Sequence, residues 1–403
     1  MFHGTFCLSS LAACRVRTLA LRPHLFGESM PTAGGLQFNR LSFMWKSLKN
    51  RMGKRKNQPS NNLPSPASTE RLLRKINEMT NLTSLTVGCY PSDDWESFNK
   101  ATAFLDAAWM HASRLRKLRL DLPLECNHAI LPTIPHFHDL EDLYILIRVE
   151  SISETHTDTL SRLVTFVNLH SSTLVRLAID VPSLEIDPSP LFFGIQCLPK
   201  LVSVAIELPS DLLQTQPNKA VDAFLIKHMM SLRELQVSFS ESTYSYDWPT
   251  PDTFFSSSTF QLSFPSLKTL DLGVCFWNFQ IDTSLSTELV KYLSKFRYTL
   301  TELAISNDTL CFPVIQQIVL LFGGADSVLR SLKIRVHYLS CDLLDLLSRD
   351  LPNLHELVLD FNSIRDKDDG HTDDSYHWEK AALVGFYFFI WVHLAHTVGF
   401  DLG

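Results

Sequence analysis

The sequence predicts an α/β solenoid, in which short parallel strands line one face and helices line the other. Three observations predict it. Leucine makes up 64 of the 403 residues, whereas glycine makes up only 14. A short apolar strand pattern recurs ten times at roughly similar spacing. Segments with the apolar period of an α-helix lie between these strands. Abundant leucine with little glycine suits stacked apolar layers better than a nucleotide-binding sheet, whose phosphate loops need glycine.

Charge divides the chain into a basic N-terminal region and an acidic body. Residues 1–78 contain 13 Lys/Arg against 3 Asp/Glu, whereas the remainder contains 23 against 40. The acidic body argues against a nucleic-acid partner, because neutralising phosphates requires clustered Lys/Arg. The eight cysteines are scattered without a CxxC pair, which indicates neither a zinc site nor a disulfide framework. Reduced cysteines in a cytoplasmic or nuclear protein are the favoured interpretation, with a membrane-associated location as the alternative.

The N-terminal regions match none of the ten repeat units. Residues 1–44 are expected to be disordered or targeting-like, since they are rich in Arg and hold no acid before Glu28, as in a mitochondrial transit peptide. Residues 45–69 combine a basic run, WKSLKNRMGKRK, with a Pro/Ser/Asn-rich linker. The folded domain is expected to begin with a short helix near residue 70.

The domain spanning residues 70–364 repeats the pattern L-x-x-L-x-L about ten times, with Val or Ile allowed at the later positions. The first leucines of the units are Leu82, Leu115, Leu140, Leu174, Leu201, Leu232, Leu267, Leu300, Leu329 and Leu354. In a strand, side chains alternate between faces, so the last two apolar positions of each unit point to one side. Apolar residues at helical spacing predict helices at 98–112, 159–169, 221–230, 285–296, 314–321 and 343–347. No unit can bury its apolar face alone, so neighbouring units must stack.

The repeated segment resembles the leucine-rich-repeat superfamily, whose motif is L-x-x-L-x-L-x-x-N/C-x-L. The unit from Leu354 matches through Asn362 and Ile364, and the unit from Leu267 matches through Cys275. In this superfamily the Asn or Cys hydrogen-bonds the backbone of the turn after the strand; the other eight units lack it. The resemblance implies an irregular horseshoe with parallel strands on its concave face, helices on its convex face and long convex-side insertions. Regularity is expected to be lowest toward the N-terminal half.

Irregular repeats of this length, without a signal peptide or disulfide caps, resemble fungal and plant proteins that pair an F-box with leucine-rich repeats. This resemblance implies a target-recognition subunit of a cullin-type ubiquitin ligase, with a short N-terminal helical box that contacts the ligase adaptor. No F-box is evident before residue 79, and residues 41–48, LSFMWKSL, resemble at most the end of such a box.

The C-terminal region leaves the repeat pattern. Residues 365–380 form a predicted acidic linker. Residues 381–403 are expected to form an apolar helix, because the twenty residues 381–400 include no Asp, Glu, Lys or Arg. That length is sufficient to span a bilayer, but a solenoid also needs a cap over its last repeat. The segment 381–400 could therefore be a cap or a membrane anchor. A repeat protein that is anchored in a membrane by its C-terminus is accordingly the alternative function.

The sequence contains no recognisable motif for catalysis, phosphate binding or metal binding. It lacks a phosphate loop, GxGxxG, GxSxG and HExxH, and the histidine pairs His136/His138 and His393/His396 offer too few ligands for zinc. We therefore expect a non-enzymatic protein–protein interaction scaffold without a cofactor or metal. An enzyme with an unrecognised site is a third alternative.

The concave face is the surface on which we expect the protein partner to bind. Residues two, four and six positions after each first leucine should point outward from the sheet. The candidates for partner binding are Lys117, Arg119, Asp142, Tyr144, Arg176, Glu234, Gln236, Asp271, Lys333 and Glu356. Equivalent positions also hold Asp121, Asp180, Glu207, Thr269, Glu302, Arg335 and Asp360. Solubility alone produces such mixed charge, so the pattern does not name the partner.

Overall fold

The chain divides into two compact units, residues 1–113 and 114–403. The computed structural model describes part of each unit. The described residues are 17–21, 74, 79, 81–88, 105, 108–109, 112–149, 156–182, 185–209, 217–240, 255, 257–273 and 283–364. The basic run and linker at 45–69, the F-box-like segment at 41–48, the acidic linker at 365–380 and the apolar segment at 381–403 lie outside them. The helix expected near residue 70 is described at Arg74, which is helical.

In the first unit, β1 (Thr18–Leu21) pairs in parallel with β2 (Ser84–Gly88). Leu19 is the register partner of Leu85. The segment VRTLAL, which starts at residue 16, therefore follows the repeat pattern with Val in place of the first leucine. Within the region 1–44, expected to be disordered or targeting-like, the structure describes only residues 17–21, and Thr18–Leu21 form this strand. Because Val16 replaces the first leucine, this unit does not fit the L-x-x-L-x-L pattern.

The second unit contains a parallel sheet in which each strand pairs with the next along the chain. Its strands are β3 (Lys117–Asp121), β4 (Asp142–Leu146), β5 (Arg176–Asp180), β6 (Ser203–Pro209), β7 (Glu234–Ser240), β8 (Thr269–Gly273), β9 (Glu302–Leu310), β10 (Ser331–Leu339) and β11 (Glu356–Ile364). Each begins two residues after the first leucine of a predicted unit. The repeat register predicted from the sequence is therefore confirmed.

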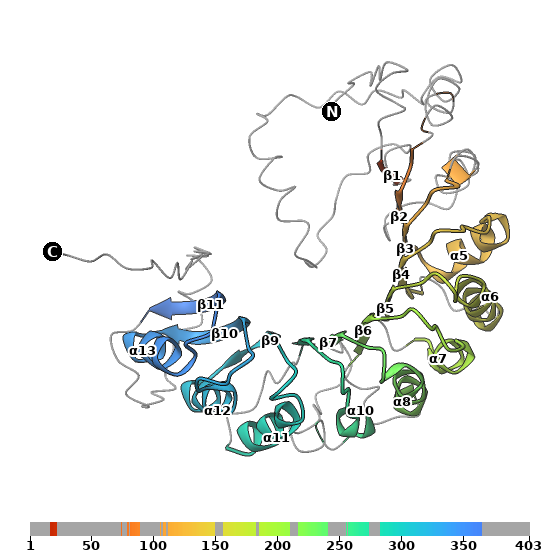
Figure 1. Ribbon diagram of the computed structural model, residues 1–403. Coiled ribbons are helices and arrows are strands. Elements are labelled where there is room, and N and C mark those ends of the chain that lie inside the picture. Colours follow the sequence, from red (N-terminus) through yellow and green to blue (C-terminus); the bar gives the residue numbers. More distant parts are fainter. Residues whose placement is uncertain are drawn as a thin grey trace, which may run out of the picture. The chain divides into compact units, whose positions relative to one another are not determined.

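Helices cover the outer side of this sheet, so the strands line the inner side of an arc (Figure 1). They are α5 (Leu124–Ile130), α6 (His156–Leu169), α7 (Ser189–Gly194), α8 (Pro217–His228), α10 (Ser258–Gln261), α11 (Thr283–Ser294), α12 (Phe312–Phe322) and α13 (Cys341–Asp350). The predicted helices from residue 159 onward overlap α6, α8, α11, α12 and α13. The predicted helix at 98–112 is described at four positions, of which Leu105, Ala108 and Trp109 are helical and Ala112 is not. Helices α5, α7 and α10 were not predicted, because so few turns show no clear apolar period.

The core lies between the sheet and the helices. In β3, for example, Leu118 and Leu120 are buried, and Leu115 in the preceding turn joins them. The intervening Lys117 is exposed and Arg119 is half-buried, so the polar positions face the other side of the sheet. This alternation is the one that the repeat pattern predicts for a strand with one buried face.

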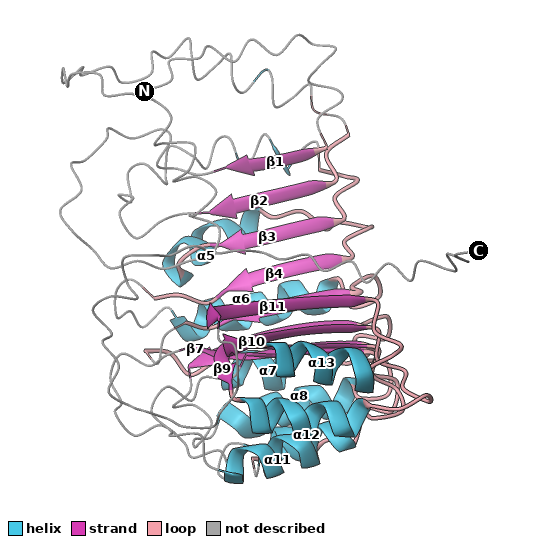
Figure 2. Ribbon diagram, turned by 90° about the vertical axis from the view of Figure 1, so that its left-hand side faces the viewer, coloured by secondary structure: helices cyan, strands magenta, loops and turns pink. Residues whose placement is uncertain are grey.

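One main-chain carbonyl in each unit sets the register of the next. The carbonyl oxygen of Arg116 accepts the N–H groups of both Glu141 and Asp142 at 2.9 Å. The equivalent carbonyls that accept two such bonds are those of Glu141, Val175, Val202, Arg233, Lys268, Thr301 and Arg330. In the first unit, the carbonyl of Arg17 accepts from Thr83 and Ser84 in the same way. Within the second unit, the turns that precede the strands stack along one edge of the sheet (Figure 2).

A buried histidine joins two neighbouring units at the end of α6. The Nε2 atom of His170 accepts the main-chain N–H of Phe137 at 3.1 Å, and its Nδ1 atom lies 2.8 Å from the carbonyl oxygen of Phe166. Because Nε2 accepts a hydrogen bond, the proton of the neutral ring is on Nδ1, which donates to Phe166. Burial lowers the pKa of His170 and favours this neutral form.

The end of α8 repeats this arrangement. His228 accepts the N–H of Leu198 at Nε2, at 3.0 Å, and its Nδ1 lies 2.8 Å from the carbonyl oxygen of Phe224. Burial lowers its pKa as well. Phe296 occupies the corresponding position, four residues before a first leucine, in the unit from Leu300. In these two units the position holds a buried ring, and each histidine adds one hydrogen bond between units, from the N–H of Phe137 or Leu198.

The pairing of neighbouring strands is not equally regular along the described part of the second unit. Strands β3 to β8 pair in continuous register, whereas the pairing of β9 with β10 shifts between Ile334 and Val336, toward the C-terminal end of the array. The superfamily motif implies that Asn362 hydrogen-bonds the turn after its strand, and that turn lies outside the described residues. Strand β11 continues through Asn362 to Ile364, and the side chain of Asn362 is exposed.

Candidate interaction surface

The concave face of the second unit presents three rows of side chains across neighbouring strands. The first row, two residues after each first leucine, is Lys117, Asp142, Arg176, Ser203, Glu234, Thr269, Glu302, Ser331 and Glu356. The middle row is Arg119, Tyr144, Ala178, Ala205, Gln236, Asp271, Ala304, Lys333 and Val358. The last row includes Asp180, Glu207, Ser238, Gly273 and Ser306.

All ten residues predicted to bind a partner lie in the first and middle rows, and none is buried. The structure brings one subset together at the β3–β5 end, namely Lys117, Arg119, Asp142, Tyr144 and Arg176. Gln236 and Asp271 are register partners on β7 and β8. Lys333 and Glu356 lie on β10 and β11, at the other end of the sheet. The ten residues therefore share one face but do not form one cluster.

Ion pairs order the first row at this end. Asp142 Oδ2 lies 3.1 Å from Arg176 Nη2 and 4.0 Å from Lys117 Nζ. A single carboxylate thus lies between two cations on the flanking strands. The group is partly exposed to solvent, so it contributes little to stability, but it holds all three side chains in one arrangement.

Tyr144 is the centre of a second group, in the middle row. The guanidinium carbon of Arg119 lies 3.7 Å from the centroid of the Tyr144 ring, which is a cation–π contact. The hydroxyl of Tyr144 donates a hydrogen bond of 2.8 Å to Asp180 Oδ2. Burial, followed by the nearby charge of Asp180, raises the pKa of Tyr144 well above its usual range, so its hydroxyl stays a donor. The ring is therefore fixed between a cation and a carboxylate.

Asp180 and Glu207 are neighbours in the last row. Burial raises the pKa of Asp180, and burial together with the charge of Asp180 raises the pKa of Glu207 to about 7. Asp180 Oδ1 is buried and has no hydrogen-bond partner among the described residues. Both residues were expected on this face but not among the binding candidates, because a strand pattern shows neither how deeply a side chain is buried nor which charges surround it.

Further along the sheet, carboxylates accept hydrogen bonds from hydroxyl groups. Ser306 donates to Asp271 Oδ1 at 3.0 Å, and Thr269 donates to Glu302 Oε2 at 3.2 Å. The β10–β11 end of the face again contains an ion pair, in which Arg335 Nη2 lies 2.7 Å from Asp360 Oδ2. Acids therefore dominate the centre of the concave face, and ion pairs occupy its two ends.

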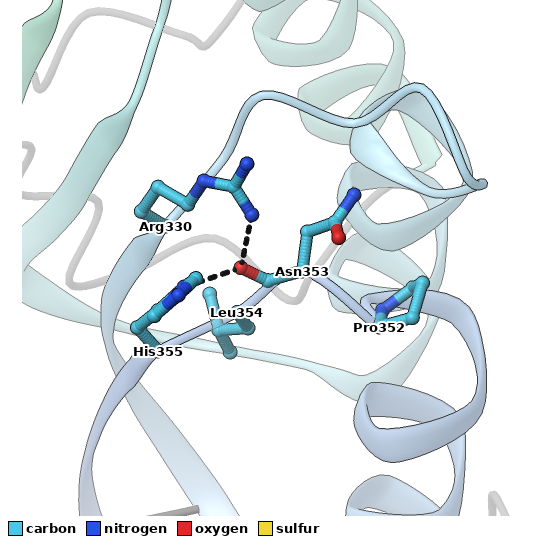
Figure 3. A pocket seen from close by; sticks show the side chains of 5 residues that line it. All are labelled: Arg330, Pro352, Asn353, Leu354 and His355. Atoms are coloured by element: carbon cyan, nitrogen blue, oxygen red, sulfur yellow. Dashed lines mark hydrogen bonds between the residues drawn. The ribbon is translucent and has the colours of Figure 1, made fainter. Parts of the chain in front are cut away.

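A shallow pocket near the end of the described array is built mainly from main-chain contacts (Figure 3). The carbonyl oxygen of Asn353 accepts from Arg330 Nη1 at 2.9 Å and lies 2.7 Å from His355 Nδ1. Asn353 Nδ2 in turn donates to the carbonyls of Ala325 and Ser327. These polar groups satisfy one another, so the pocket is best explained as the turn before β11.

The described residues contain no group of three or more His, Cys, Asp or Glu side chains that could hold a metal ion. The rings of His136 and His138 lie 4.7 Å apart, and His136 stacks on His170 at 5.1 Å. The pair His393/His396 and the segment 381–400 lie outside the described residues. Within the part of the chain that the structure describes, no helix is both long and apolar enough to cross a membrane.

Repeated strands in parallel register, an outer layer of helices and a recurring main-chain bond at each turn define a leucine-rich-repeat solenoid of the α/β class. No protein-family model matches the chain, and no curated protein is significantly similar in sequence. Among solved structures, the chain is similar to the leucine-rich-repeat-containing protein LegL7 from Legionella pneumophila. The two are 15% identical, the match covers 71% of this chain and 87% of that one, and the TM-score is 0.40. The assignment of the fold rests on the repeat geometry rather than on this likeness.

Proposed function

We propose that the protein is a non-enzymatic scaffold that binds a protein partner on the concave face of its repeats. The observation that carries the proposal is the fixed arrangement of polar side chains around Tyr144 and Asp142. Each is held by contacts with neighbouring strands at 4.0 Å or less. Side chains that are already ordered lose little conformational entropy on binding, which favours affinity. Arg and Tyr are also the residue types that contribute most strongly to protein interfaces.

The experiment compares the partners captured by three forms of the full chain. Lys117→Ala with Arg119→Ala changes the concave face, and Lys291→Ala with Arg349→Ala makes the same change of charge on the convex helices α11 and α13. We expect at least one partner to bind the wild type and the convex variant but not the concave variant. Recovery of the same partners in equal amounts by all three forms would contradict the proposal.

The finer form of this proposal is target recognition for a cullin-type ubiquitin ligase, supported by the resemblance of the repeats to F-box proteins. It requires that the full chain bind the ligase adaptor through residues 1–78. Capture of the adaptor by the full chain, and its loss when residues 1–78 are deleted, would support this role. If the full chain recovers no adaptor, the ligase role is excluded while the scaffold function stands.

A further inference from the structure

Large apolar side chains are exposed where the helices α6, α7 and α8 end. The exposed fractions are 53% for Leu169, 53% for Phe193, 50% for Ile226 and 68% for Met230, which directly follows α8. Among the described residues, these are four of the seven large apolar residues that are exposed. A single exposed apolar side chain is ordinary on a soluble protein, but a group of them indicates an interaction surface.

Hydrogen bonds between the helix ends show that these side chains belong to one surface. Asn168 Nδ2 donates to the carbonyl oxygen of Gly194 at 3.0 Å, which joins the end of α6 to the end of α7. Lys227 Nζ donates to the carbonyl oxygens of Phe193 and Ile195, at 3.2 Å and 2.8 Å, and joins the end of α8 to the end of α7. The three helices lie side by side in the outer layer (Figure 1).

The turns that follow α7, α8, α10 and α11 carry cations and no acid. These turns, residues 195–202, 229–233, 262–268 and 295–301, contain Lys200, Arg233, Lys268, Lys295 and Arg297. Among the described residues, Lys200, Arg233 and Lys268 have no ion-pair partner. The turn before β4 differs, since it contains Asp139 and Glu141. Positive charge is therefore confined to the turns that lead into β6 to β9.

Main-chain bonds place these cations beside the apolar side chains. The N–H of Arg233 donates to the carbonyl oxygen of Val202 at 2.8 Å, and the N–H of Lys268 donates to that of Arg233 at 2.8 Å. Ser266 Oγ donates to the carbonyl oxygen of Met230 at 3.2 Å. The four apolar residues therefore share one edge of the second unit with Lys200, Arg233 and Lys268. We call this surface the turn edge, because the turns stack along it (Figure 2).

We infer that the turn edge binds the surface of an anionic lipid bilayer. Apolar side chains insert at the boundary between headgroups and acyl chains, and cations are attracted to the negatively charged headgroups. Peptides bind in grooves or along free sheet edges. The apolar side chains of the turn edge instead stand at the ends of separate helices in the outer layer, where a flat bilayer can reach them.

The acidic character of the rest of the chain does not prevent this contact. The nearest acids in the sequence, Glu234 and Glu302, begin β7 and β9 and lie in the first row of the concave face. More distant charges are screened beyond roughly 8 Å at physiological salt, so the cations of the turn edge determine the local attraction. Binding at this edge leaves the concave face open to a protein partner. The inference thus goes beyond the proposed function and does not depend on it.

The test measures how fast two exposed thiols of the full chain are alkylated. Cys197 lies in the turn edge, between Phe193 and Lys200 in the sequence, and Cys341 is the first residue of α13; both are free. Phosphatidylcholine vesicles with and without phosphatidylserine are added, and mass spectrometry of proteolytic peptides reads each cysteine separately. We expect vesicles that contain phosphatidylserine to slow alkylation of Cys197 by at least about threefold and to leave Cys341 unchanged.

One pair of variants tests the cations. Arg233→Gln with Lys268→Gln should raise the lipid concentration that half-protects Cys197 by at least about tenfold, because each cation near an anionic surface contributes to binding. The matched control is Lys333→Gln with Arg349→Gln, which removes the same charge from the concave face and from α13. It should change the half-protecting concentration by less than about twofold.

A second pair tests the apolar side chains. Phe193→Ser with Met230→Ser should also raise the half-protecting lipid concentration by at least about tenfold, because two apolar side chains no longer leave water. Leu320→Ser with Leu344→Ser changes two exposed leucines on α12 and α13 and should have little effect. Circular dichroism confirms that all variants are folded.

Several results would overturn the inference. Equal protection of Cys197 and Cys341, or no protection of Cys197, would show that any vesicle contact lies elsewhere, as on the basic run 45–56 or the segment 381–400. Equal protection by neutral and anionic vesicles would show that the cations have no role. Protection of Cys197 by an acidic, amphipathic helical peptide but not by vesicles would assign the turn edge to a protein partner instead.

Discussion

Tyr144 and Asp180 are joined by a hydrogen bond of 2.8 Å that runs diagonally from the middle row of β4 to the last row of β5. The two residues are not register partners, since Tyr144 pairs with Ala178. The bond therefore ties two rows of the concave face together. With Arg119 stacked on the ring, it makes this end of the surface rigid before any partner arrives.

Removing this bond should lower stability. Tyr144→Phe keeps the ring and its contact with Arg119 but takes the donor away from Asp180, so we expect a loss of about 1 kcal/mol in the free energy of unfolding. Urea denaturation measures it. Tyr298→Phe, at a tyrosine that is 78% exposed, is the control and should change nothing. Equal effects of the two substitutions would show that the hydrogen bond is not the cause.

Glu207 should make the protein less stable as the pH rises. Its pKa in the folded chain is about 7, above its ordinary value of 4.5. The folded state therefore binds more protons than the unfolded state between these values, and stability falls as the pH rises through this window. Glu207→Gln should remove that dependence and raise the free energy of unfolding at pH 8 by on the order of 1 kcal/mol, since the carboxyl is partly solvated. Unfolding curves at pH 5 and pH 8 test it, and a variant that is less stable at pH 8 would refute it.

The hydrogen bonds that His170 and His228 make between units should add to the stability that their buried rings provide by packing. Phe296 shows that phenylalanine fits this position, so His170→Phe keeps the volume but leaves the buried N–H of Phe137 without its acceptor. We expect a loss of about 1–3 kcal/mol, measured by chemical denaturation. His228→Phe should behave alike. The exposed His355, changed to Phe, serves as the control, and an equally large loss there would contradict the assignment.

The same histidines should also make the protein sensitive to acid, with a sign opposite to that of Glu207. Burial lowers the pKa of His170 and His228 below 6.5, so below that pH the unfolded state binds more protons and stability falls. In the Glu207→Gln background, stability should decline as the pH drops from 7 to 5, and the decline should shrink when both histidines are replaced by phenylalanine. An unchanged decline would assign the acid sensitivity to other groups.

The strand β1 should protect the amides of the turn before β2. Thr83 and Ser84 both donate to the carbonyl of Arg17, so deleting residues 1–21 removes their acceptor. We expect hydrogen exchange at these two amides to accelerate by at least about tenfold, while the equivalent amides of Glu141 and Asp142 in the second unit keep their rates. Unchanged exchange at Thr83 and Ser84 would mean that β1 does not pair with β2 in solution.

Most of the second unit's fold was predictable, because one leucine-based pattern specifies strand, buried face and register in every unit. Units that depart from the pattern were missed, as at β1, where valine replaces the first leucine. The concave face was also predictable as a set of positions. Its contacts were not: Tyr144 and Asp180 are 36 residues apart in the sequence, and a diagonal bond between them depends on the pairing of strands whose connections vary in length. The raised pKa of Glu207 likewise depends on burial, which a period-two pattern does not encode.

The recurring bond at the turns has a consequence for how such a protein changes through evolution. It uses only carbonyl and N–H groups, and the residues that supply the carbonyl include Arg116, Glu141 and Val175. The register between neighbouring units therefore depends neither on which side chain occupies that position nor on the length of the connection that follows. Insertions on the outer side and substitutions on the inner side become separable events. A lineage can exchange the partner of this protein by replacing concave side chains without redesigning the scaffold that presents them.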